Sequence, residues 1–559
     1  MSKKIANMVF HNLEKTWSDY ELLYPIRKDG AAACTVRFAP SPTGFMHIGG
    51  LYTALINSVF AHRNNGVFLL RIEDTDQKRL VEDGVQEIID TLKDFNIVFD
   101  EGSLNETEEY GAYGPYRQSQ RREIYQAYAK CLIEQGKAYP CFCSEEDLQQ
   151  LREEQTAKGA LQIGYYGEWA NCRALSEDEI LSKISSGQAY IIRLRSPGSN
   201  RMRNFADGLR GTIAMPENQL DAVIIKGDGL PTYHFAHAID DHLMRTTHVI
   251  RADEWLSSLP LHVQLFEMLD FALPEYIHLS PIVKLEQREG SANPSRRKLS
   301  KRKDPEARVH YYDEAGHPVE AVLDYLLTIS SADYEPWRVQ HMDTAITEFP
   351  LNITQSGLAG AQFDFQKLNS VSRNRIAHMG NEEISEHVLK WADKYDKKLS
   401  AYISSNPSQF HSSVHLWHDK RLDVAKWSDL IDLYPYLYDE DYRNDYSAME
   451  EILQGHMERA DLILREYLGS FCYADDASIW FGKIRTLAET VGYAASVAAY
   501  KKNSDAYLGS IVDIAGIIRY VITGQTNTPD LYGIIHIIGE EEMRSRINRF
   551  LSIANARSM

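Results

Sequence analysis

Between residues 34 and 130, short apolar runs alternate with amphipathic stretches. CTVRFAP and GVFLLRIED are short apolar runs bounded by turn residues, which predicts buried strands. LYTALINSVFAHRNNG and VEDGVQEIIDTLKDF repeat apolar residues at helical spacing, which predicts helices. Because strand, helix and strand follow one another directly, this order indicates a βαβ unit of a parallel sheet.

The pattern changes between residues 131 and 220, where a cysteine pair precedes a polar helical stretch and the strand-like AYIIRLRS. Near residue 221 the pattern of buried strands resumes with DAVIIKGDG. It continues through HFAHAIDDHLM and THVIRADEW to YIHLSPIV. The simplest arrangement is a nucleotide-binding sheet formed by residues 34–130 and 221–290, interrupted by an inserted domain at 131–220.

A basic loop follows, and beyond about residue 375 the pattern is mostly helical. EEISEHVLKWADKYDKKLSAYI, HMERADLILREYLGSF and IWFGKIRTLAETVGYAASVAAYKK all have helical spacing of apolar residues. We therefore expect a region at 291–375 that carries the basic loop, then a helical domain at 376–559. Residues 1–33 form an N-terminal extension to which the sequence assigns no role.

Composition narrows the class of protein. The chain has 559 residues, 44% hydrophobic and 25% charged, as expected for several globular domains. It has no apolar run long enough for a membrane span and no apolar signal segment, so we expect a cytoplasmic protein. The net charge of −19 argues against general nucleic-acid binding, although an acidic body can carry a local basic face.

The strongest local motif is VRFAPSPTGFMHIGGLYTALIN at residues 36–57. A strand ends there in a turn whose glycines let the backbone approach a ligand: Gly44, Gly49 and Gly50. The helix that follows presents free N–H groups to an anion, and His47 could add a side-chain donor toward phosphate. The same residues are equally consistent with a glycine turn beside a packed histidine.

A second motif, RKLSKRKD, occupies residues 297–304. Lys298 and Lys301 could neutralise charge that develops on phosphate oxygens. Taken alone, the motif is more typical of a solvated charge cluster.

The two motifs together resemble the paired HIGH and KMSKS signatures of class I aminoacyl-tRNA synthetases. RFAPSPTG, RIEDTD, GPYRQSQR, PTYHFAHAIDDHLM and HVIRADEWLSSLP are similar to the glutamyl branch of that class, the glutamyl-tRNA synthetases. The resemblance covers nearly the whole chain from about residue 34. It implies an α/β fold: a Rossmann-type catalytic domain with an α/β insertion that binds the tRNA acceptor end. A stem-contact region with the KLSKR loop and an all-helical anticodon-binding region would follow.

The resemblance also assigns site residues. Phosphate charge would be stabilised by His47, Lys298 and Lys301. Glutamate would be bound by Arg37, Ser41, Glu73, Tyr233 and Arg251, with both arginines on a carboxylate and the serine and glutamate on the ammonium. ATP would contact His47, Gly49, Gly50, Trp255 and Lys301. His237 stands where some family members have Asn.

The implied reaction has two steps and needs no side-chain nucleophile. Glutamate attacks the α-phosphate of ATP, and the terminal ribose of tRNA(Glu) then attacks the glutamyl-adenylate. Mg²⁺ is expected to arrive with ATP, because the sequence has no dedicated cage for it. The expected partners are tRNA(Glu) and L-glutamate, with a monomeric enzyme and no membrane.

A metal site is a further expectation. Some relatives bind zinc through a Cys-x-Cys pair and a later Cys, which correspond to Cys141, Cys143 and Cys172. The family's histidine is missing here, so the fourth ligand would be Tyr165, Tyr166 or Glu168. Three ordinary buried cysteines are the equal alternative.

Other functions stay open at this point. A glutaminyl-tRNA synthetase shares the catalytic plan, and an enzyme charging both tRNA(Glu) and tRNA(Gln) would have the same motifs. A family of shorter enzymes that glutamylate a modified base in tRNA is another alternative. Those enzymes lack the C-terminal anticodon-binding region that this chain is expected to have. A non-catalytic RNA-binding paralogue would not need His47 and the two lysines together.

Overall fold

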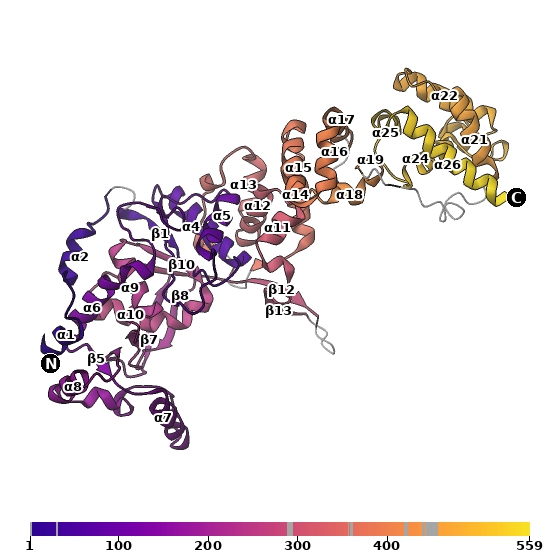
Figure 1. Ribbon diagram of the computed structural model, residues 1–559. Helices are drawn as coiled ribbons and strands as arrows, with labels where there is room; N and C mark the ends of the chain where they lie inside the picture. Colours follow the sequence, from indigo (N-terminus) through magenta and orange to yellow (C-terminus); the bar gives the residue numbers. More distant parts are fainter. Residues whose placement is uncertain are drawn as a thin grey trace. The chain divides into compact units, whose positions relative to one another are not determined.

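The computed structural model describes residues 3–28, 32–287, 294–355, 357, 361–418, 423–438, 442 and 457–558. The chain forms two compact units (Figure 1). One comprises Met1–Tyr312 and Val322–Phe365, and the other comprises Asp313–Ala321 and Gln366–Met559. The expected border at residue 290 lies outside the described residues. Among the described residues, every helix is too short or too polar to cross a membrane.

The first unit is built on parallel strands. β1 (Thr35–Phe38), β2 (Val67–Leu70) and β3 (Glu101–Ser103) pair in parallel, and β4 (Glu109–Tyr110) adds an antiparallel edge. The backbone N–H of Thr247 donates to the Thr35 carbonyl at 2.9 Å. This bond brings a second parallel pair beside β1, namely β10 (His248–Ala252) and β11 (Glu275–Leu279). The strand order confirms the predicted Rossmann-type sheet.

Helices connect and cover these strands. α4 (Ile48–Arg63) links β1 to β2 and is buried along most of its length, which confirms the predicted βαβ unit. The other helices of this part are α5 (Gly84–Asp94), α6 (Arg122–Glu134), α9 (Tyr233–Leu243) and α10 (Leu259–Met268).

The insertion has its own antiparallel sheet of β5 (Ala138–Cys141), β6 (Ile191–Leu194) and β9 (Val223–Ile225). α7 (Glu145–Ala157) and α8 (Glu177–Ser185) accompany it. A hairpin of β7 (Met202–Asp207) and β8 (Gly211–Pro216) returns to the catalytic sheet, where the Gly208 N–H donates to the Tyr276 carbonyl at 2.8 Å.

Two predictions for this part are wrong. DAVIIKGDG was expected to resume the nucleotide-binding sheet, but β9 pairs with β6 inside the insertion. HFAHAIDDHLM was expected to continue the strands, but it forms α9. Phe235, Ile239 and Leu243 recur at helical spacing, so the sequence carried a helical signal that the prediction did not use.

The N-terminal extension packs on the catalytic core. α1 (Lys3–Val9) and α2 (Trp17–Leu23) share a hydrophobic core with α6. Arg27 binds both carboxylate oxygens of Glu101, at 2.7 and 2.8 Å. The extension therefore contributes to the stability of the first unit.

After β11 the chain forms a small sheet that carries the basic loop. β12 (Ile282–Glu286) pairs with β13 (Ser295–Lys298) and with β14 (Ala361–Gln362). The helices that follow are α11 (His310–Ala315), α12 (Val319–Ser330) and α13 (Tyr334–Gln340). The KLSKR segment thus begins at the end of a strand and continues into a turn.

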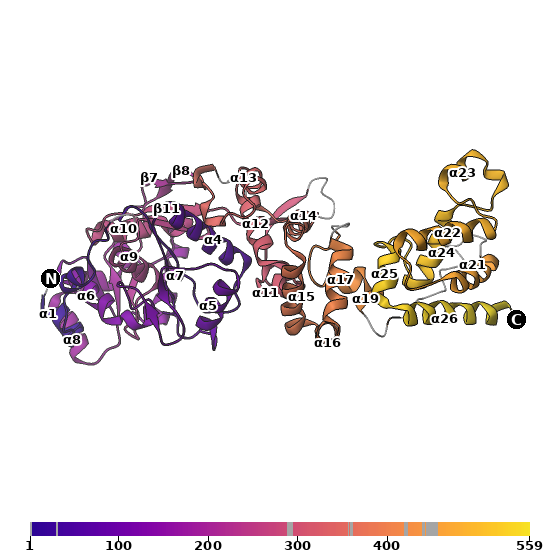
Figure 2. The same cartoon turned by 90° about the horizontal axis from the view of Figure 1, so that it is seen from above.

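The second unit is helical, as predicted. Its helices are α14 (Phe365–Ile376), α15 (Asn381–Tyr395), α16 (Lys397–Ser405), α17 (Pro407–His418), α18 (Asp429–Leu433), α19 (Pro435–Tyr438), α21 (Met457–Ser470), α22 (Ala477–Thr490), α23 (Val497–Lys502), α24 (Ile511–Thr523), α25 (Leu531–Ile538) and α26 (Glu540–Ser558). α21, α22, α24 and α26 pack together (Figure 2). The stretch with helical spacing at 382–403 forms two helices, because Asp396 caps α16 by accepting from the Leu399 N–H.

Candidate active site

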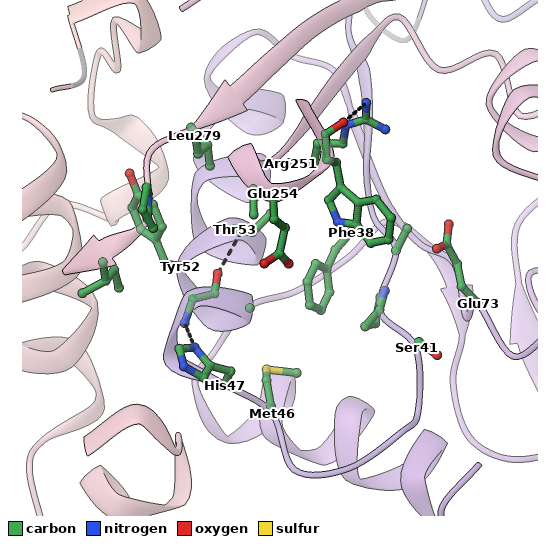
Figure 3. Close-up of a pocket in the computed structure, with 18 of the residues that line it drawn as sticks. Phe38, Ser41, Met46, His47, Tyr52, Thr53, Glu73, Arg251, Glu254 and Leu279 are labelled. Atoms are coloured by element: carbon green, nitrogen blue, oxygen red, sulfur yellow. Dashed lines mark hydrogen bonds between the residues drawn. The ribbon is translucent and has the colours of Figure 1, made fainter. Parts of the chain in front are cut away.

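A cleft of about 470 Å³ opens at the carboxyl ends of β1 and β10 (Figure 3). The carboxyl ends of parallel strands are the usual ligand-binding edge of such sheets. The structure brings every predicted glutamate, ATP and phosphate residue into the lining of this cleft: Arg37, Ser41, His47, Gly49, Gly50, Glu73, Tyr233, Arg251, Trp255, Lys298 and Lys301. Their individual roles remain predictions.

His47 joins the two sequence motifs. It caps α4, with Nδ1 accepting from the Gly49 N–H at 2.9 Å. Its proton is therefore on Nε2, which lies 3.3 Å from the Leu299 carbonyl oxygen of the KLSKR segment. Burial lowers the pKa of His47, which keeps the ring neutral. The ring connects the HIGG turn to the basic loop through these two contacts.

The two lysines of the basic loop also have protein acceptors. Lys298 forms an ion pair with Glu254, and both side chains are about half exposed. The Lys301 ammonium donates to the Phe45 carbonyl, within the turn that precedes His47. Burial lowers the pKa of Lys301. Both lysines are therefore held at the cleft by contacts that an anionic ligand could replace.

An acidic pair on α9 anchors the arginines behind the cleft. Asp241 accepts from Arg37 Nε at 3.1 Å and from Arg71 Nη1 at 2.6 Å. Asp240 accepts from Arg121 Nε at 2.7 Å. Burial opposes the ionisation of Asp241, but Arg37 and Arg71 outweigh it and hold its pKa well below the usual range. These buried charges fix the end of β1 and β2 relative to α9.

Glu73 lies where the arginine cluster meets the cleft. Its carboxylate is 3.1 Å from Arg71 Nη2, and burial raises its pKa. The next residue, Asp74, accepts from the backbone N–H and the hydroxyl of Ser119, both at 2.7 Å. RIEDTD and GPYRQSQR, far apart in the sequence, therefore form one polar layer beneath the site.

Arg251 is held differently, by neutral groups. Its guanidinium donates to His278 Nε2 and to His262 Nδ1, each at 3.0 Å, and to the Trp255 carbonyl at 3.3 Å. No carboxylate pairs with Arg251 among the residues that the structure describes. Tyr233 packs on Trp255 beside it, with ring centroids 4.3 Å apart. The positive charge of Arg251 is consequently available to a ligand.

Sequence reasoning missed Asp240, Asp241, His262 and His278. Two adjacent aspartates within HFAHAIDDHLM, among apolar residues and histidines, were the available signal, because buried carboxylates require partners. Nothing local to His262 or His278 distinguishes them from packed histidines.

Three cysteines form a separate cluster in the insertion. The sulfurs of Cys141, Cys143 and Cys172 all lie within 4.8 Å of one another, and Cys143 and Cys172 are 3.6 Å apart. The Tyr165 hydroxyl is 3.3 Å from the Cys143 sulfur, whereas the Tyr166 hydroxyl donates to the Gln162 carbonyl. Three thiols and a phenol at these distances fit a tetrahedral zinc ion, with Tyr165 as the best placed fourth ligand.

Comparisons with known proteins agree with this geometry. Residues 33–370 match the family model described as tRNA synthetases class I (E and Q), catalytic domain, and residues 498–551 match an anticodon binding domain. The chain is 45% identical to the glutamate–tRNA ligase of Clostridium beijerinckii over 99% of this chain and 100% of that one. It is 44% identical to the glutamate–tRNA ligase of Clostridium perfringens, again over 99% and 100%.

A solved structure is similar over nearly the same length. The crystal structure of a glutamate tRNA ligase from Elizabethkingia meningosepticum, in complex with its amino acid, superposes with a TM-score of 0.75. The two chains are 29% identical, and the match covers 93% of this chain and 99% of that chain.

The buried histidine His237 gives a prediction for acid stability. Burial lowers its pKa from 6.5 to about 3, although Asp241 lies 2.9 Å from its Nδ1. Below pH 6.5 the unfolded chain therefore binds a proton that the folded chain does not. Stability should be complete above pH 6.5 and fall below it, by up to about 1.4 kcal/mol per pH unit from this residue.

His237→Asn should remove that contribution while keeping a polar side chain. We expect the melting temperature of the variant to fall less between pH 7 and pH 5 than that of the unaltered protein. An equal fall in both proteins would show that His237 titrates normally in the folded state.

Proposed function

The chain belongs to the class I tRNA synthetase family of glutamyl and glutaminyl enzymes, and we propose that it ligates glutamate to the 3′ end of tRNA(Glu) with ATP. One observation carries this proposal: the HIGG turn and the KLSKR segment meet through His47 at a cleft that Arg251 also lines, and Arg251 has no carboxylate partner in the described part of the chain. A phosphate-binding turn next to an unpaired positive charge suits a substrate that carries both phosphate and carboxylate.

The first step would place the glutamate carboxylate in line with the α-phosphate of ATP. The free N–H groups at the start of α4 and the Lys301 ammonium would stabilise charge on the phosphate oxygens. Lys298 would leave Glu254 to assist. Trp255, Gly49 and Gly50 would contact the nucleotide. Mg²⁺ that arrives with ATP would supply further neutralisation of phosphate charge beside Lys298 and Lys301.

Glutamate would occupy the arginine side of the cleft. Arg37 and Arg251 would pair with its carboxylates, because a guanidinium matches a carboxylate in shape and charge. Glu73 and Ser41 would hold the ammonium, and Tyr233 would donate a hydrogen bond. A glutaminyl enzyme is the less favoured alternative, since a neutral amide would leave a buried guanidinium uncompensated.

The RNA would contact three parts of the chain: the insertion at the acceptor end, the region of the basic loop at the stem, and the helical second unit at the anticodon. The match of residues 498–551 to an anticodon binding domain supports the last assignment. We propose that the protein is a monomer in which these three parts contact the RNA.

We also propose that the cysteine cluster binds one structural Zn²⁺ through Cys141, Cys143, Cys172 and Tyr165. The three sulfurs lie within 4.8 Å of one another and the Tyr165 hydroxyl is 3.3 Å from the Cys143 sulfur, so one ion could contact all four groups. Bound zinc would stabilise the insertion by linking β5 to the segment at Cys172.

An aminoacylation assay tests the proposed function directly. Purified protein, ATP, Mg²⁺, radiolabelled glutamate and a tRNA pool containing tRNA(Glu) should yield labelled tRNA, and omission of ATP should abolish it. No charging of tRNA with glutamate would contradict the proposal and favour a non-catalytic RNA-binding role.

Lys301→Ala should lower kcat/KM for adenylate formation by about 10²–10³, the usual loss for one donor that stabilises a transition state. Lys303→Ala is the matched control, because Lys303 is an exposed lysine of the same loop that does not line the cleft. Near-normal adenylate formation by Lys301→Ala would exclude this role.

Zinc content tests the metal proposal. Protein purified without added zinc should contain about one equivalent, as expected for a site of three thiolates and one oxygen ligand. Cys143→Ser should lose it, while Cys472→Ser, an exposed cysteine outside the cluster, should retain it. Metal-free protein with full activity would instead identify the three residues as ordinary buried cysteines.

A further inference from the structure

The neutral acceptors of Arg251 have defined tautomers. A guanidinium only donates, so His278 must present a lone pair at Nε2 and carry its proton on Nδ1. For the same reason His262 must accept at Nδ1 and carry its proton on Nε2, which lies 2.9 Å from His234 Nδ1. Burial lowers the pKa of both His278 and His262, in agreement with neutral rings.

Asp207 selects the tautomer of His278. This aspartate ends β7, and its Oδ2 is 2.6 Å from His278 Nδ1 and 3.1 Å from the His278 backbone N–H. Its Oδ1 accepts from the backbone N–H groups of Leu209 and Arg210, at 3.0 and 2.8 Å. The Asp207 and His278 side chains are fully buried, so water does not compete for these bonds.

The hairpin that carries Asp207 fits closely on β11. A Cβ atom at Gly208 would lie 2.9 Å from Ile277 Cγ1, too close for any side chain without a shift. Phe205 of the same hairpin packs in a cluster with Val249 and Tyr276. The carboxylate of Asp207 is therefore held at His278 by a hairpin of the insertion that contacts β11.

We propose that Asp207 is a positioning residue for glutamate, acting through His278 to fix the guanidinium of Arg251 without neutralising it. The inference rests on the proposed function, because it takes Arg251 as a ligand of a substrate carboxylate. A carboxylate in direct contact with Arg251 would anchor it equally well but would cancel its charge. Because the His278 imidazole lies between them, the Asp207 carboxylate fixes the position of Arg251 without contacting its guanidinium.

The hydrogen bonds from Asp207 through His278 to Arg251 also connect the insertion to the amino-acid site. Asp207 lies on the hairpin of the insertion, whereas Arg251 lies on β10 of the catalytic sheet. A change in how the hairpin sits on β11 would move the anchor of the glutamate-binding guanidinium. The affinity for glutamate therefore depends on the position of the insertion's hairpin on β11.

Asp207→Asn tests the proposal with little change in shape. Whichever way the amide is oriented, its NH₂ group faces either His278 Nδ1–H or the two backbone N–H groups, and a donor meets a donor. Turning the His278 tautomer to relieve this contact would put a proton against Arg251 Nε. The KM for glutamate should rise at least about ten-fold, as for loss of a hydrogen bond to a charged group, with the KM for ATP unchanged.

The matched control is Glu267→Gln. Glu267 binds Arg203 of the same hairpin through both oxygens but has no contact with His278, so its KM for glutamate should stay at the unaltered value. A second variant, His278→Gln, keeps an oxygen acceptor near Arg251 but removes the link to Asp207. In that background Asp207→Asn should add no further loss.

Arg251→Gln separates failure of this inference from failure of the proposed function. If Arg251→Gln raises the KM for glutamate and Asp207→Asn does not, the positioning role of Asp207 is wrong while the assignment of Arg251 stands. If neither variant changes that KM, Arg251 is not a glutamate ligand and the inference is wrong, while the aminoacylation assay still decides the proposed function. A fall in melting temperature with equal losses for glutamate and ATP would reduce Asp207 to a structural residue, and would also overturn the inference.

Discussion

The cleft depends on two adjacent carboxylates, Asp240 and Asp241, buried near the end of α9. A buried guanidinium without a partner is strongly unfavourable, so Arg37, Arg71 and Arg121 can occupy the interior only because these carboxylates are there. The arginines come from β1, from the end of β2 and from the segment before α6. Three distant parts of the chain are thereby fixed at the edge of the sheet where the cleft opens.

Charge is distributed unevenly across this site. Asp241 satisfies two guanidiniums at once, whereas Arg251 is held by His262, His278 and a backbone carbonyl. The neutral acceptors leave the Arg251 side of the cleft positive, and the start of α4 with Lys301 makes the opposite side attractive to phosphate. A substrate with a carboxylate at one end and a phosphate at the other fits this distribution, as does the family to which the chain belongs.

Much of the fold could be predicted from the local spacing of apolar residues. In β1, α4 and β2 this spacing matches the side chains that are buried. The helical spacing of Phe235, Ile239 and Leu243 in α9 was overlooked, and the pattern was insufficient at β9, whose partner is decided by tertiary pairing. The cleft residues were found through motifs whose chemistry is visible in the sequence. Asp207 and His278 were not, because residues 71 apart meet only after the hairpin packs on β11.

The central claim is that guanidinium charge at the cleft selects a carboxylate side chain. The most direct measurement is the ratio of kcat/KM for glutamate to kcat/KM for glutamine, compared between the unaltered enzyme and Arg251→Gln, since Arg251 is the cleft guanidinium that neutral groups hold. The account predicts a strong preference for glutamate that falls at least about ten-fold in the variant, because a charge-assisted bond is lost for glutamate alone. Equal losses for both amino acids would contradict it.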